Sequence, residues 1–166
     1  MTYVYKPFEL ETFISKMYQQ MGIFYPEQID EDYIAAQLGI ELVYSRHRSY
    51  ADEDEDEDFK IINIHKYLDP FQKREVFFHE LGHLLRHGGD QTEMTQMFRD
   101  WQEWDAKRFT QYAAIPYHML RFIDFTLPQQ HILLEMSETF RVPESLCQSR
   151  LEQIERNTRK SYAYIE

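Results

Sequence analysis

Apolar side chains recur every three or four residues in the first part of the chain, which is the spacing of a helix with one buried face. Between residue 7 and about residue 22 they form one stripe that ends at a glycine, with members Phe8, Phe13, Ile14, Met17 and Met21. Asp30 is a suitable N-cap for a shorter helix that runs to Leu38, and Gly39 ends it. The pattern therefore predicts two helices in this segment.

Two short runs that follow are rich in Ile, Val and aromatic residues and predict strands, at residues 40–45 and 60–65. Between them lies an acidic loop, residues 51–59, in which Asp and Glu alternate from Asp52 to Asp58. Consecutive like charges repel one another and stay hydrated, so we expect a solvated loop that joins the two strands. The other interpretation is an attractive surface for a basic partner, such as a DNA-binding repressor.

Helical spacing returns after Asp69 and continues to the C-terminus. Asp69 and Pro70 form a good cap and first-turn pair, and Gly88-Gly89 would end the helix that they begin at about His87. Further helical segments are expected at about residues 91–114, at residues 117–123 and, as a C-terminal pair, at residues 128–160. The sequence thus predicts an α+β fold that is mainly helical with a small β-sheet.

The composition fits one soluble domain that spans residues 1–166. Of 166 residues, 43% are hydrophobic and 16% aromatic, which is enough for a full core. Eighteen basic and 29 acidic residues give a net charge of −11, which repels phosphate backbones and argues against direct nucleic-acid binding. No apolar run approaches the roughly 18 residues of a membrane span, and from the aromatic and polar residues 1–8 we expect no secretory signal. Because Cys147 is the only cysteine, we expect a cytoplasmic protein without disulfides.

The strongest chemical motif is His79-Glu80-Leu81-Gly82-His83, inside the helix expected after Pro70. Residues four apart on a helix lie on the same face, so His79 and His83 can bind one zinc ion. Glu80 lies beside that face, where a carboxylate can act as general base on a water molecule. The motif therefore predicts a catalytic zinc site.

A hydrolytic zinc site needs a third protein ligand, and the next helix offers two carboxylates. Glu103 is the better candidate, because Ala106 one turn later is small enough to let the two helices approach closely. Asp105 is the competitor. The two side chains point about 200° apart on a helix, so only one of them can bind the metal. Spacing alone does not choose between them.

Two segments resemble the signatures of the ImmA/IrrE metallopeptidases. VFFHELGHLLRH, residues 76–87, is similar to the metal helix of that family. QEWDAKRF and AAIP, residues 102–109 and 113–116, resemble its second signature, in which a glutamate lies three residues before an alanine. The resemblance implies a zincin-like domain in which His79, His83 and Glu103 hold zinc and Glu80 is the base. Lys107 departs from the pattern, because the family usually has Asn there.

Four further residues are candidates for oxyanion or substrate contacts. His87 lies one turn beyond His83, where it could touch substrate or form a hydrogen bond within the site. Tyr112, Tyr117 and His118 follow Glu103 and could stabilise the oxyanion that forms when water attacks a peptide carbonyl. Each could equally be a packing residue.

Two functions from different classes are consistent with these residues. The first is a zinc endopeptidase, whose substrate the resemblance identifies as a helix-turn-helix repressor of a phage or mobile element. The second is a binding module that captures a transcriptional regulator and relieves repression without cutting it. Glu80 separates them, because only the enzyme needs a general base.

Overall fold

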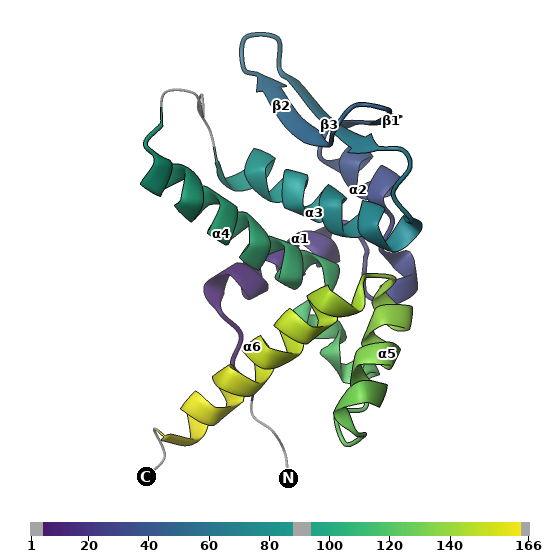
Figure 1. Cartoon of the computed structure of the whole chain (residues 1–166), viewed down its shortest axis with the longest axis vertical. Helices are drawn as coiled ribbons and strands as arrows, with labels where there is room; N and C mark the ends of the chain where they lie inside the picture. Colours follow the sequence, from purple (N-terminus) through teal and green to yellow (C-terminus); the bar gives the residue numbers. More distant parts are fainter. Residues whose placement is uncertain (1–4, 88–93, 164–166) are drawn as a thin grey trace.

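The protein is a mainly helical α+β domain in which a small sheet covers one side of the central helix α3 (Figure 1). The computed structural model describes residues 5–87 and 94–163, with side chains up to residue 158. In chain order the elements are α1 (Glu9–Gln20), η1 (Pro26–Gln28), α2 (Glu31–Gln37), β1 (Glu41–Ser45), β2 (Tyr50–Asp54), β3 (Phe59–His65), α3 (Pro70–Arg86), α4 (Gln96–Ala114), η2 (Tyr117–Phe122), α5 (Gln129–Phe140) and α6 (Glu144–Ala163). The expected fold class is therefore confirmed.

The predicted helix starts at Asp30 and Asp69 are also confirmed, because each depends on local capping hydrogen bonds. The Asp69 carboxylate accepts from the backbone N–H groups of Phe71 and Gln72, and Asp30 accepts from the N–H of Tyr33. Helix α4 begins at Gln96, whereas the expected start near residue 91 and the Gly88-Gly89 stop lie outside the described residues.

The sheet corrects one expectation about the acidic segment. Its strand order is β1-β3-β2, with β1 parallel and β2 antiparallel to β3. Residues 50–54 form the edge strand β2, so the expected acidic loop at 51–59 is only a short turn between β2 and β3. Asp52 and Asp54 stay solvent-exposed on this strand, and their charges therefore do not prevent its backbone from pairing with β3.

Helices α3 and α4 pack closely, and this contact places the two halves of the candidate site together. Phe77, Phe78 and Leu81 of α3 and Phe109 of α4 are fully buried. Gly82 makes the close approach possible, because a Cβ at this position would lie only 3.0 Å from Cδ1 of Phe109. Ala106 is also fully buried, in agreement with the expected small residue on this face of α4.

None of the described helices is long and apolar enough to cross a membrane.

Candidate metal centre

His79 and His83 lie one turn apart on α3, and both direct their Nε2 atoms toward α4. The two Nε2 atoms are 3.2 Å apart. The Glu103 carboxylate reaches them from α4, with Oε2 at 3.2 Å from Nε2 of His79 and Oε1 at 3.0 Å from Nε2 of His83. Three ligand atoms from two helices therefore converge on one point.

This donor set suits a catalytic zinc ion, which commonly takes two imidazoles and one carboxylate. Ligand atoms placed tetrahedrally at zinc-bond lengths lie roughly 3.3 Å from one another, and one candidate ligand atom from each of the three side chains lies within 4.8 Å of the other two. The Glu103 side chain is 49% exposed, whereas His83 is 13% exposed. The centre is thus open to solvent on the α4 side, and a water or substrate molecule has access to a fourth position.

Burial favours the neutral form of both imidazoles. It lowers the pKa of His79, with a smaller contribution from Lys107, and outweighs the Glu103 carboxylate, which raises it. Burial also lowers the pKa of His83. Neutral imidazole is the form that binds metals, so the environment of these side chains fits the proposed donor set.

Asp105, the other carboxylate that the sequence offered, occupies a different place. Its Oδ2 lies 2.6 Å from Nε of Arg86 and 3.0 Å from Nε2 of His87, and the residue is almost fully buried. Burial alone would raise the pKa of Asp105, but hydrogen bonds from Arg86 and His87 lower it overall. Glu103 is therefore the carboxylate that faces the His79–His83 pair.

Glu80 lies beside the ligand cluster and is held by the edge of the sheet. The backbone of Ala51 in β2 lies close enough to its carboxylate to favour the ionised form. Burial, assisted by the Glu103 charge, raises the pKa of Glu80 to about 7. A carboxyl group with such a pKa can both accept and release a proton near neutrality.

A cavity of about 430 Å³ begins at His79 and Glu80. Its walls come from α3, α4, the start of α6 and the residue before β2; other lining residues are Ser49, Glu75, Val76, Lys107, Thr110, Gln111, Ser145, Leu146 and Ser149. Lys107 brings a positive charge to this cavity one turn beyond Glu103. Lys107 was not identified from the sequence as a residue of this cavity. Its spacing could have indicated it, because Lys107 lies four residues after Glu103 and residues four apart share a helix face.

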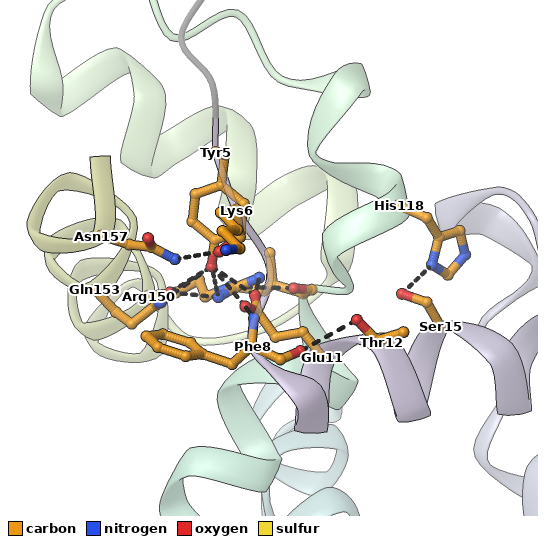
Figure 2. Close-up of polar contacts among 11 residues, drawn as sticks. Tyr5, Lys6, Phe8, Glu11, Thr12, Ser15, His118, Arg150, Gln153 and Asn157 are labelled. Atoms are coloured by element: carbon orange, nitrogen blue, oxygen red, sulfur yellow. Dashed lines mark hydrogen bonds and ion pairs between the residues drawn. The ribbon is translucent and has the colours of Figure 1, made fainter. Parts of the chain in front are cut away.

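Of the four candidate substrate contacts, only His87 lies near the metal centre. Its Nδ1 is 3.2 Å from Nδ1 of His83, so it forms a hydrogen bond within the site. Figure 2 shows His118 bonded instead to Ser15 of α1, with 3.0 Å between its Nδ1 and the Ser15 Oγ. Tyr117 stacks on Tyr5, with ring centroids 5.4 Å apart.

The remaining candidate, Tyr112, is also placed away from the cluster. It lies nine residues after Glu103, which is about half a turn out of phase on a helix, and therefore faces the opposite side of α4. There its ring lies 4.9 Å from the guanidinium carbon of Arg150. The structure thus places Tyr112, Tyr117 and His118 among other side chains and away from His79 and His83, and a role for them in substrate contact stays a prediction.

Comparison with known proteins gives a consistent result. Residues 35–152 match the family model of peptidase family M78, described as the IrrE N-terminal-like domain. The chain is 32% identical over 147 residues to uncharacterized protein YqaB of Bacillus subtilis strain 168, an alignment that covers 86% of this chain and 81% of YqaB. It is 29% identical to the phage-like element PBSX protein XkdA of the same strain, covering 89% of this chain and 73% of XkdA.

Proposed function

The chain belongs to the IrrE N-terminal-like family of metallopeptidases, and we therefore propose that it is a zinc-dependent endopeptidase that cleaves another protein. The observation that carries the proposal is the position of Glu80 beside the three convergent atoms of His79, His83 and Glu103. A structural metal site has no need of such a carboxylate, whereas hydrolysis requires a base next to the metal.

In the proposed reaction His79, His83 and Glu103 hold the ion. When bound there, zinc acts as a Lewis acid that polarises the scissile carbonyl and lowers the pKa of water to about 7. Glu80 removes a proton from the attacking water as the water oxygen forms its bond to the carbonyl carbon. The carbon–nitrogen bond then breaks, and Glu80 returns the proton to the leaving nitrogen.

Lys107 supplies the positive charge that the oxyanion requires in this scheme. It lines the same cavity as His79 and Glu80, and its charge acts on His79. Tyr112, Tyr117 and His118 are engaged elsewhere, as described above. A cation fixed near the reacting carbonyl stabilises the negative charge that develops on its oxygen.

The proposed substrate is a helix-turn-helix repressor of a phage or mobile element. XkdA, to which the chain is similar, is a protein of the phage-like element PBSX. Charge supports a basic partner, because the protein carries a net charge of −11 and the acidic residues 52–58 continue from the strand that contacts Glu80. DNA-binding repressors present basic surfaces, and complementary charge speeds their encounter with an acidic protein.

The test is co-expression with the helix-turn-helix repressor encoded beside the gene, followed by intact-mass measurement of the repressor. We expect two fragments with the parent protein and with the control Glu138→Gln, which alters an exposed carboxylate on α5. Glu80→Gln should retain zinc and leave the repressor whole. Cleavage by Glu80→Gln, or an intact repressor with the parent under inducing conditions, would reject the peptidase function.

A reporter gene controlled by the repressor distinguishes a peptidase from a binding module that does not cut. If the protein only binds the repressor, the parent and the Glu80→Gln variant should relieve repression equally well, and no repressor fragment should form. A peptidase relieves repression only while Glu80 is present.

A further inference from the structure

The buried side chain of His87 connects the candidate metal centre to the carboxylate of Asp105, deeper in the protein. His83 Nδ1 lies 3.2 Å from His87 Nδ1, and His87 Nε2 lies 3.0 Å from Asp105 Oδ2. The side chains of His87 and Asp105 are each only 2% exposed. The connection therefore runs through protein rather than through water.

With a metal ion on Nε2 of His83 and Asp105 ionised, one placement of the ring hydrogens on neutral His83 and His87 satisfies both contacts. Nε2 of His83 faces His79 and Glu103, so a metal ligand there requires its lone pair to be free and its hydrogen to sit on Nδ1. That hydrogen is donated to Nδ1 of His87, which must be an acceptor. The hydrogen of His87 then sits on Nε2 and is donated to Asp105.

Asp105 is itself held from two helices. Arg86 of α3 donates to both of its oxygens, at 2.6 and 3.2 Å, and Arg108 of α4 lies 3.9 Å from Oδ1. These contacts keep the carboxylate an ionised acceptor and fix its direction. Trp101 packs edge-on against the His87 ring, with centroids 5.7 Å apart, and keeps this ring in place.

The end of α3 explains how His87 reaches this position. Helical backbone stops at Arg86, and His87 adopts extended angles, φ −128° and ψ 102°, while its N–H still donates to the His83 carbonyl. The ring of His87 thus lies beside that of His83, with centroids 5.3 Å apart.

We propose that His87 and Asp105 are positioning residues that select the Nδ1–H tautomer of His83 and aim its Nε2 at the metal. The role rests on the proposed metal centre but not on peptidase activity. Loss of hydrogen-bonding partners behind a metal ligand typically weakens metal binding about 10–100-fold. We expect this range for His87→Phe, which keeps an aromatic ring but can neither accept nor donate a hydrogen bond.

The first test reads the tautomer directly in the metal-free protein by long-range ¹H–¹⁵N correlation NMR of the histidine rings. The parent and the control His131→Phe, which changes an exposed histidine of α5, should show His83 protonated on Nδ1. In His87→Phe the His83 ring should become a mixture of both tautomers. A parent His83 protonated on Nε2, or an unchanged His83 in His87→Phe, would overturn the proposal.

The second test measures zinc affinity by competition with a chromophoric chelator, together with urea unfolding of each metal-free variant. His87→Phe should bind zinc about 10–100-fold more weakly, and His87→Gln, which retains an acceptor and a donor, should lose less. If zinc affinity falls only in proportion to a loss of folding stability, His87 has a packing role and the proposal is rejected. If both tests succeed but no repressor is cut, the positioning role stands and the peptidase function fails.

Discussion

The Arg150 guanidinium of α6 lies 2.7 Å from the Glu11 carboxylate of α1, and both side chains are completely buried (Figure 2). Tyr5 donates to the same carboxylate, and the Arg150 Nε donates to the carbonyl of Ile115 just after α4. One ion pair therefore joins the N-terminal segment, the last helix and the end of the helix that carries Glu103.

Removal of the Arg150 charge should destabilise the protein strongly. Arg150→Met leaves Glu11 buried without its cation, a change that typically costs about 3–5 kcal/mol. Urea unfolding followed by circular dichroism measures the effect. The matched control Arg156→Met alters an exposed arginine of the same helix and should stay within about 0.5 kcal/mol of the parent. The double variant Glu11→Leu/Arg150→Met should recover part of the loss, and further loss in it would contradict this explanation.

Loss of one of the three proposed ligand side chains should abolish tight metal binding. His79→Ala and Glu103→Ala each leave two of the atoms that converge in the structure. The parent should retain one equivalent of zinc after dialysis, and both variants should retain much less, as measured by elemental analysis. Asp100→Ala removes an exposed carboxylate one turn before Glu103 and should bind zinc like the parent. Full zinc retention by Glu103→Ala would show that Glu103 is not a zinc ligand.

The distance between α3 and α4 should control metal affinity through Gly82. An alanine Cβ there would lie 3.0 Å from Cδ1 and 3.2 Å from Cγ of Phe109, so the Phe109 side chain, and with it α4, would have to give way by a few tenths of an ångström. Overpacking of this kind costs about 1–3 kcal/mol, and the shift should carry Glu103 away from the histidines. Gly82→Ala should therefore lower both folding stability and zinc affinity.

Gly39→Ala is the control for this substitution, because it adds the same methyl group in open space. Its φ of +68° makes alanine strained, at a cost of about 1–2 kcal/mol. Folding stability should fall while zinc affinity stays unchanged. Equal zinc losses in both variants would show that general destabilisation, and not helix separation, weakens the site.

Neutralisation of Lys107 should slow the chemical step. With the repressor fragments as readout, Lys107→Met should reduce kcat by about 10²-fold, because an oxyanion donor is lost. KM and zinc content should change little, since Lys107 lies outside the ligand set. Lys16→Met, an exposed lysine on α1, should cut at the parent rate. A rise in KM with kcat preserved would instead make Lys107 a substrate-binding residue.

Local patterns carried most of the correct sequence predictions. Asp30 and Asp69 were identified as helix caps because the capping bond spans only two or three residues. His79 and His83 were paired for the same reason, since their common face follows from helix geometry alone. The edge strand β2 was missed because a run of acidic residues disfavours a strand locally. Only pairing with β3, which lies later in the chain, supplies the hydrogen bonds that form it.

Residue types and helical spacing were enough to identify the candidate metal ligands and the helix that presents the two histidines. They did not determine whether Glu103 or Asp105 completes the set, because both are carboxylates on one helix and differ only in direction. The packing of α4 on α3 determines which of the two carboxylates faces the histidines. Contact of Gly82 with Phe109 sets the separation of these helices, and Arg86 and His87 bind Asp105. Glu103 is thereby left facing His79 and His83, because a side chain's surroundings depend on contacts distant in sequence.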